Sequence, residues 1–260
     1  MAHYILQSET DDLNLEINIV HELLKRTKYI NSYEALSIDQ LTADKSDRVI
    51  VPVGNIPFVE KWLQLNKGIT KENPLEVPKY LRLPELLNRE YSIVKAKDLP
   101  RTGKWFIKDA DTLKAWTYAG DMETFELDKA LQEKKNEFDF SLKIKPETNC
   151  VLSEYLDVIS EYRVYVVNNN IVDISYYNGN PLVFPDVKVI SKANSLIRLN
   201  EKWLKSYTID VMVTDRGTSI IEVHNFTSVG LYSTLWNDDL LYAYRQGIDY
   251  LLNDNKVLEV

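Results

Sequence analysis

The spacing of hydrophobic residues divides the chain into two parts. In the first ninety residues, the apolar runs at 3–6 and 48–53 predict two buried strands, and apolar residues at helical spacing predict helices starting near Leu13 and spanning 58–65. Strands and helices that alternate at this spacing are typical of a small α/β unit with a largely parallel sheet. We therefore predict an N-terminal α/β lobe over residues 1–90. It ends in a connecting stretch at 66–90 that is rich in Pro, Asn and charged residues and has room for one short helix.

Beyond residue 90 the pattern changes to short runs of β-branched and aromatic residues. Turn residues at 168–170 and 215–217 predict two tight hairpins between such runs. The predicted strands lie at 92–94, 105–108, 150–154, 163–167, 171–177, 207–213 and 219–223, and the predicted helices at 125–137, 191–202 and 235–252. Residues 91–260 are thus predicted to be α+β with antiparallel hairpins.

Two acidic residues interrupt the apolar strands on either side of the turn at 215–217. A hairpin centred on this turn places Asp210 opposite Glu222, with Cβ atoms about 5 Å apart. Two carboxylates this close repel each other unless a positive group lies between them, and Mg²⁺ prefers oxygen ligands of this kind. We therefore expect a metal site here. The alternative is that one carboxylate points to solvent or pairs with a lysine. His224, two positions after Glu222, shares its face.

Three basic residues occupy positions suited to holding an anion. Lys108 ends an apolar strand, and Lys114 follows six positions later. A lysine at the mouth of a strand can hold a phosphate as a point charge. Arg163 lies in a strand whose alternation places it beside Tyr165. Each of the three can equally be an ordinary surface residue whose charged end reaches water.

Composition narrows the class of protein. Of the 260 residues, 45% are hydrophobic and 27% charged, as in a globular protein with a sizeable core. The formal net charge of −8 argues against non-specific nucleic-acid binding. The single cysteine, Cys150, allows no internal disulfide and no cysteine metal site, which favours a reducing compartment. Without a signal peptide or a run of about 18 apolar residues, we expect a cytoplasmic protein with no membrane partner. The oligomeric state stays open.

The order of these segments resembles the ATP-grasp superfamily, and in particular its small stand-alone members from bacteria and phages. The Phe-Val-Lys-Pro stretch of that clade corresponds to residues 106–109, and its Lys-x-Phe-Thr-Gly stretch to residues 114–120. The strand and glycine at 51–55 resemble the clade's N-terminal lobe. The similarity therefore covers most of the chain, with the specific motifs between 104 and 232.

This resemblance implies a nucleotide held between two α+β lobes, with ATP and Mg²⁺ as cofactors. The implied nucleotide-binding residues are Lys108, Lys114, Ser153, Glu154, Tyr155, Leu156, Glu161 and Arg163, of which Lys114 and Arg163 are also the implied catalytic residues. The implied metal ligands are Asp210, Glu222 and either His224 or Asn225. The family metal motif ends in Asn, where this chain has His224 followed by Asn225. A second departure is Asp109, which replaces the usual proline beside Lys108.

The implied activity is that of a carboxylate–amine ligase. Such an enzyme activates a carboxylate as an acyl phosphate, which an amine then attacks, and its substrates are small molecules or peptides. The His224 departure leaves open a phosphotransferase or a nucleotide-dependent binding protein on the same fold. A non-enzymatic interaction protein is the third alternative, and it requires five charged positions to match by accident.

Overall fold

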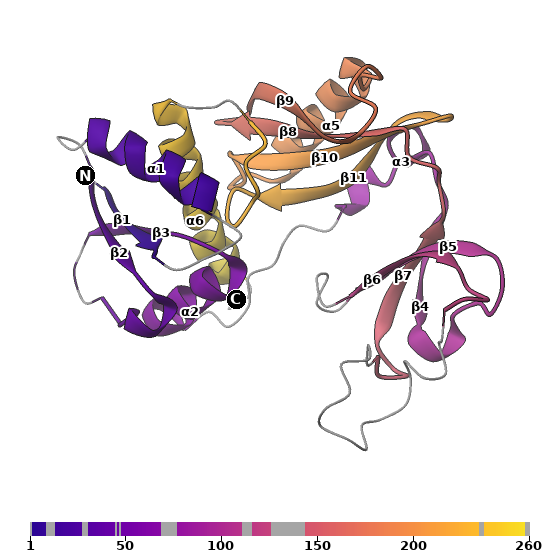
Figure 1. Cartoon of the computed structure of the whole chain (residues 1–260), viewed down its shortest axis with the longest axis horizontal. Coiled ribbons are helices and arrows are strands. Elements are labelled where there is room, and N and C mark those ends of the chain that lie inside the picture. Colours follow the sequence, from indigo (N-terminus) through magenta and orange to yellow (C-terminus); the bar gives the residue numbers. More distant parts are fainter. Residues whose placement is uncertain are drawn as a thin grey trace.

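The computed structural model describes residues 2–8, 14–27, 31–44, 46, 48–68, 77–110, 116–125, 144–233 and 237–257. Its strands form three sheets with the orders β2-β1-β3, β4-β7-β5-β6 and β11-β10-β8-β9. We call them the N-terminal, central and C-terminal sheets. Figure 1 shows the central sheet set apart from the other two, which lie closer together. The predicted helix at 125–137 lies outside the described residues except at its first position, as do the candidate helix caps Thr10 and Asp11.

The N-terminal sheet is fully parallel, as the sequence predicts. It contains β1 (Ala2–Gln7), β2 (Asn31–Leu36) and β3 (Val49–Val53), which are joined through helices α1 (Asn14–Arg26) and α2 (Ile56–Lys67) and the short turn η1 (Ile38–Gln40). Helix α2 begins where the Asn55 side chain accepts a hydrogen bond from the Phe58 amide. Strand β2 was missed because its sequence, NSYEAL, is mostly polar and partly exposed.

The central sheet is antiparallel and has a small core of its own. A linker with η2 (Lys79–Leu81) and α3 (Pro84–Leu87) leads to β4 (Tyr91–Lys95), η3 (Ala96–Asp98), β5 (Lys104–Asp109), β6 (Thr117–Asp121) and β7 (Asn149–Glu154). A separate cluster of buried side chains, which includes Ile107, Trp116 and Cys150, packs against this sheet.

The C-terminal sheet is also antiparallel and consists of the predicted hairpins. It contains β8 (Ser160–Val167), β9 (Asn170–Gly179), β10 (Tyr207–Thr214) and β11 (Gly217–Asn225), with helices α5 (Val187–Asn200) and α6 (Asp238–Val257). Helix α6 contacts α1, β3 and β8, so the N-terminal and C-terminal sheets share one continuous core. Two of the three sheets thus form one packed unit, and the central sheet contributes a second one.

The arrangement is the α+β organisation that the sequence predicts, with a parallel N-terminal sheet and two antiparallel sheets. Among the helices in the described part of the chain, none combines the length and the apolar character that a membrane span needs.

Candidate active site

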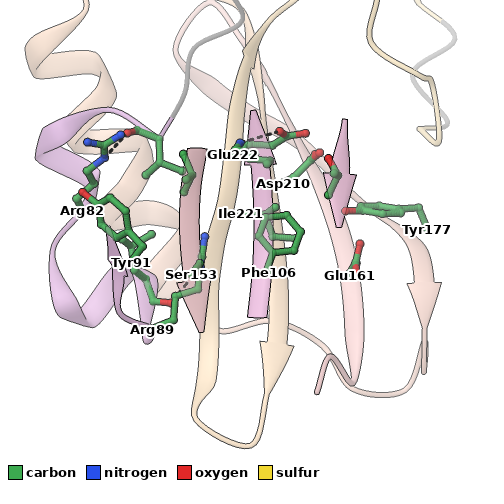
Figure 2. Close-up of a pocket in the computed structure, with 15 residues that line it drawn as sticks. Arg82, Arg89, Tyr91, Phe106, Ser153, Glu161, Tyr177, Asp210, Ile221 and Glu222 are labelled. Atoms are coloured by element: carbon green, nitrogen blue, oxygen red, sulfur yellow. Dashed lines mark hydrogen bonds and ion pairs between the residues drawn. The ribbon is translucent and has the colours of Figure 1, made fainter. Parts of the chain in front are cut away.

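A cavity of about 420 Å³ is lined by residues of the linker, the central sheet and the C-terminal sheet. This volume is in the range of small-molecule and cofactor sites. In Figure 2, Tyr91 and Ser153 lie on one side, Asp210 and Tyr177 on the other, and Phe106 between them. The cavity therefore has an aromatic and apolar side and a charged side, which suits a ligand with a flat ring at one end and charge at the other.

The charged side is built on neighbouring positions of three strands. Asp210 of β10 lies opposite Glu222 of β11, as the sequence predicts, and opposite Arg163 of β8 on its other edge. The next row along the same face contains His224 and Thr208, because side chains two positions apart share a face. Ligand atoms of Asp210, Glu222 and His224 all lie within 4.8 Å of one another.

The donor set of this group fits a divalent cation. Asp210 and His224 are buried, with 3% and 6% of their surface exposed, and Glu222 lines the cavity. Two carboxylates and one imidazole are ligands that divalent cations accept in proteins. Asn225 follows on the opposite side of the strand by alternation, where its Oδ1 accepts a hydrogen bond from the Thr227 hydroxyl at 2.6 Å.

Arg163 forms a buried, two-pronged ion pair with Asp210. Its Nε and Nη2 donate to the two Asp210 carboxylate oxygens, each at 2.7 Å, and Nη1 donates to the Gly230 carbonyl at 3.0 Å. Burial by itself lowers the pKa of Arg163, but the hydrogen-bonded Asp210 outweighs this effect, so the pKa is raised. In the structure the guanidinium is engaged with Asp210, behind the cavity wall. Loss of either partner would leave an uncompensated buried charge, which costs about 3–5 kcal/mol.

Lys108 reaches the same carboxylates from the central sheet. Its Nζ lies 4.0 Å from Glu222 Oε2, and its side chain is only 14% exposed. Asp109, the departure from the family pattern, is buried on the opposite side of β5 by alternation, and its main-chain amide donates to the Trp116 carbonyl. Its carboxylate is therefore directed away from the cavity that Lys108 lines. Lys114 lies outside the described residues.

The apolar side of the cavity contains a buried cation that sequence reasoning missed. Arg89 donates from Nη1 to the carbonyls of Ile220, at 2.8 Å, and Leu87, at 3.2 Å. Burial lowers its pKa to about 10, so it remains a cation at neutral pH. Arg82 lies over the Tyr91 ring, 4.9 Å from its centroid. Both arginines line the cavity together with Lys108, which makes this wall favourable for a polyanionic ligand.

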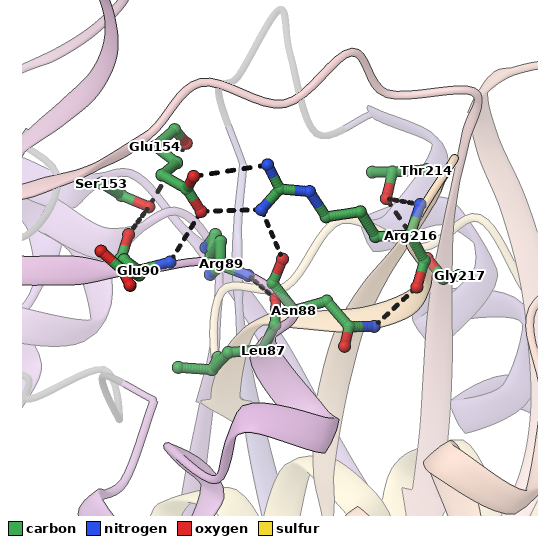
Figure 3. Close-up of polar contacts among 9 residues, drawn as sticks. All are labelled: Leu87, Asn88, Arg89, Glu90, Ser153, Glu154, Thr214, Arg216 and Gly217. Carbon is green, nitrogen blue, oxygen red and sulfur yellow. Dashed lines mark hydrogen bonds and ion pairs between the residues drawn. The ribbon is translucent and has the colours of Figure 1, made fainter.

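The predicted hinge lies where β7 leaves the central sheet. Ser153 lines the cavity, and its hydroxyl donates to the Glu90 carbonyl at 3.3 Å. Figure 3 shows that the Glu154 carboxylate accepts from the Glu90 amide and from the Arg216 guanidinium, at 2.9 and 2.8 Å. Glu154 therefore ties the linker to the β10–β11 turn. Tyr155 and Leu156 follow in the extended connection to β8 and do not line the cavity.

Two β-bulges direct side chains at the cavity. The pairing of β8 with β9 skips Tyr177, and the pairing of β10 with β11 skips Ile221, and both residues line the cavity. Bulges of this kind re-aim a side chain next to a site. Burial raises the pKa of Tyr177, and the charge of Asp210 and a hydrogen bond with Glu161 add to this effect. Glu161, an expected nucleotide contact, lines the same wall.

Comparison with known proteins gives the chain a family and a fold. A family model described as an ATP-grasp domain, family 2 of its clade, matches residues 87–239. A RimK domain ATP-grasp protein from Sphaerobacter thermophilus aligns with a TM-score of 0.59 at 12% identity, over 96% of this chain and 100% of its own. The D-cycloserine synthetase DcsG aligns with a TM-score of 0.58 at 10% identity, over 97% and 100% of the two chains.

A third similar structure is the D-alanyl-alanine synthetase A of Vibrio cholerae O1 biovar eltor, with a TM-score of 0.56 at 14% identity, over 98% of each chain. No curated protein matches the chain by sequence. At these identities the structural similarities establish the fold alone, and that fold is ATP-grasp. The α+β fold class predicted from the sequence is thereby confirmed, as is the resemblance on which it rested.

Proposed function

Because the chain belongs to this ATP-grasp domain family, we propose that it is an ATP- and divalent-metal-dependent carboxylate–amine ligase. The observation that carries the proposal is the approach of Lys108 to Glu222. A cation from the central sheet and the carboxylates of the C-terminal sheet meet across one cavity, with 4.0 Å between Nζ and Oε2. A metal-bound polyphosphate needs both kinds of group, because the metal ion neutralises some phosphate oxygens and lysine the others.

The two sides of the cavity assign the parts of the nucleotide. Its apolar side, with Tyr91, Phe106 and Ile221, suits the purine ring, and main-chain groups near Ser153 are available to it. The charged side, with Lys108 and Glu222, suits the phosphates. Lys114 remains a predicted phosphate contact.

Arg163 acts on the transferring phosphoryl group in this proposal. Both Asp210 oxygens accept from its guanidinium in the structure, so a metal ion bound to Asp210 has to share that carboxylate with it. Arg163 then lies beside the metal-bound phosphates. Charge neutralisation of this kind is the main protein contribution to phosphoryl transfer.

The reaction follows from these roles. A carboxylate oxygen of the acid attacks the γ-phosphorus of ATP, ADP leaves, and an acyl phosphate forms. The amine then attacks the acyl carbon, inorganic phosphate leaves, and the nitrogen loses a proton as the amide forms. The protein positions the reactants and neutralises phosphate charge, so no nucleophilic side chain is required. The structural relatives named as synthetases support this reading.

The test is nucleotide binding by variants of the acidic pair. ATP with a divalent cation should raise the melting temperature of the wild-type chain, because ligand binding stabilises the native state. The double change Asp210→Asn with Glu222→Gln should abolish this shift. Glu222→Gln alone is the cleaner variant, because it leaves the Arg163–Asp210 pair intact. The exposed pair Asp98→Asn with Glu123→Gln, which lies outside the cavity, is the matched control. An unchanged shift in the folded acidic-pair variants contradicts the proposal.

His224 favours one alternative, a phosphotransferase or a nucleotide-dependent binding protein on the same fold, because it departs from the usual ligand set. Product analysis separates the two. A ligase releases phosphate from ATP only when acid and amine are both consumed, and it forms a new covalent bond. An untargeted screen of amino-acid and peptide mixtures for an ATP-dependent gain in mass would identify the substrates. A product that carries the γ-phosphate stably, with no amide, supports the phosphotransferase.

A further inference from the structure

His224 adds a nitrogen atom to the two carboxylates of the charged wall. It lies two residues after Glu222 on β11, and its Nε2 is 2.6 Å from Glu222 Oε1. The imidazole is 6% exposed, so packing holds it in this position. The group therefore presents two oxygens and one nitrogen to the same small volume.

The chemistry of this donor set differs from that of a magnesium site. Mg²⁺ prefers oxygen ligands throughout, whereas imidazole suits first-row transition ions. Mn²⁺ accepts carboxylates and phosphate oxygens as Mg²⁺ does, and it also accepts a nitrogen ligand. Adjacent ligands around an octahedral ion of this size are about 3 Å apart and opposite ones about 4 Å. The spacing of at most 4.8 Å among the three side chains thus needs only small adjustments.

We propose that Asp210, Glu222 and His224 form a site that selects a nitrogen-accepting transition ion, represented by Mn²⁺, over Mg²⁺. This inference rests on the proposed function, because the ion is the one that accompanies the nucleotide. It also decides between the two residues that the sequence leaves open for the third ligand position.

The backbone supports His224 rather than Asn225 as the third ligand. The register shift in the β10–β11 pair lies at Ile221, on the turn side of Glu222, so residues 222–225 alternate regularly. Asn225 therefore points to the other side of the sheet, where it is 1% exposed and bonded to Thr227. No irregularity in this described stretch brings its amide round to the carboxylates.

Thr208 gives a second, independent indication of a ligand at this position. It pairs directly with His224 across the strands and lies on the same face as Asp210. Its hydroxyl is fully buried and has no hydrogen-bond partner among the described residues. Buried hydroxyl groups are nearly always bonded, so this one calls for a partner such as an ion-bound water.

The competing explanation is that His224 only orients Glu222 through a hydrogen bond. In that case the imidazole stays outside the coordination sphere, and the site behaves as an ordinary magnesium site. The two explanations differ in whether nitrogen binds the metal, which spectroscopy reports directly.

The experiment uses the full chain with Mn²⁺ alone and with Mn²⁺ plus the β,γ-methylene analogue of ATP, which has no bridging nitrogen. Electron spin-echo modulation should show the ¹⁴N coupling of a metal-bound imidazole. Competition with Mg²⁺, followed by the Mn²⁺ resonance signal, should show a preference for Mn²⁺. His224→Asn should lose the ¹⁴N coupling, and its Mn²⁺ affinity should fall about tenfold or more, the scale on which even outer-sphere changes act.

His21→Asn is the matched control, because His21 bonds Tyr33 in the N-terminal lobe and lies outside the cavity. It should keep both the coupling and the preference for Mn²⁺. Wild-type protein that binds Mn²⁺ without ¹⁴N coupling overturns the inference, and this result does not depend on whether any variant folds. An unchanged Mn²⁺-to-Mg²⁺ ratio in folded His224→Asn also overturns it.

The outcomes separate this inference from the proposed function. Nucleotide binding with either metal but no ¹⁴N coupling leaves the ligase proposal intact and removes the manganese site. Coupling with Mn²⁺ alone but no nucleotide binding does the reverse. No binding of Mn²⁺ or nucleotide removes both.

Discussion

Glu16 is a buried carboxylic acid in the contact between α1 and α6, and its replacement by glutamine should change how stability depends on pH. Only 3% of the residue is exposed, its Oε1 accepts a hydrogen bond from the Tyr244 hydroxyl, and its Oε2 has no partner among the described residues. Burial raises the pKa of Glu16 from 4.5 to about 7, although the Tyr244 hydrogen bond and the positive charge of Arg163 oppose the rise.

The size of the effect follows from this pKa. Below pH 4.5 the carboxyl group is protonated in both the folded and the unfolded chain. Between pH 4.5 and about 7 the unfolded chain loses the proton while the folded chain keeps it, so the free energy of unfolding falls as pH rises. Above about pH 7 both forms are ionised and the loss is complete. A shift of this size corresponds to a loss of about 3 kcal/mol.

Urea unfolding of Glu16→Gln and wild type between pH 4 and 8.5 measures this loss. Glutamine keeps the size of the side chain and does not titrate. The difference in free energy of unfolding, variant minus wild type, should therefore rise by about 3 kcal/mol between pH 4.5 and 8. All other titrating groups are common to both proteins and cancel in the difference.

Glu22→Gln provides the control on the same helix. Glu22 is exposed, and its hydrogen bond with Lys25 lowers its pKa, so this variant should show no rise with pH. A difference for Glu16→Gln that stays flat from pH 4.5 to 8 would refute the assignment of a raised pKa to Glu16. A slope of the opposite sign would mean that the folded protein stabilises the ionised form.

Two further predictions concern packing. Gly247→Ala should destabilise the protein by about 1–3 kcal/mol in urea unfolding, despite the better helix propensity of alanine, because the new Cβ would lie 2.6 Å from the Phe226 carbonyl oxygen; equal or higher stability would contradict this. The thiol of Cys150 is fully buried in the separate core of the central sheet, so it should not react with a thiol reagent in the native protein. It should become reactive at a lower urea concentration than the one that exposes the main core, and simultaneous exposure would show that the two cores unfold together.

Local patterns in the sequence were sufficient for the elements and for one pair of site residues. The opposition of Asp210 and Glu222 follows from a tight turn and from the two-residue period of strands, and both features lie within a few residues. Buried strands such as β1 and β3 are continuous apolar runs, so they could be recognised. Strand β6, TYAGD, was missed because it contains glycine and few β-branched residues.

The rest of the site depends on contacts between distant segments. Arg163 meets Asp210 only because β10 lies between β8 and β11 in the sheet, an order that no local pattern specifies. Arg89 enters the cavity because the linker crosses β11, where it bonds the Ile220 carbonyl. The bulge at Tyr177 leaves no trace in the residue pattern, since one extra residue in a strand changes neither composition nor average period.

The sequence by itself therefore determined the α+β class, most of the strands and the family to which the chain belongs. Those properties are encoded in short-range periodicity and in the order of a few motifs. Only the tertiary structure decided that His224 rather than Asn225 faces the carboxylates, that Arg163 is paired with Asp210, and that α6 joins the N-terminal lobe to the C-terminal sheet. These outcomes depend on which surfaces pack together, and the free energy of that packing is a property of the whole chain rather than of any segment.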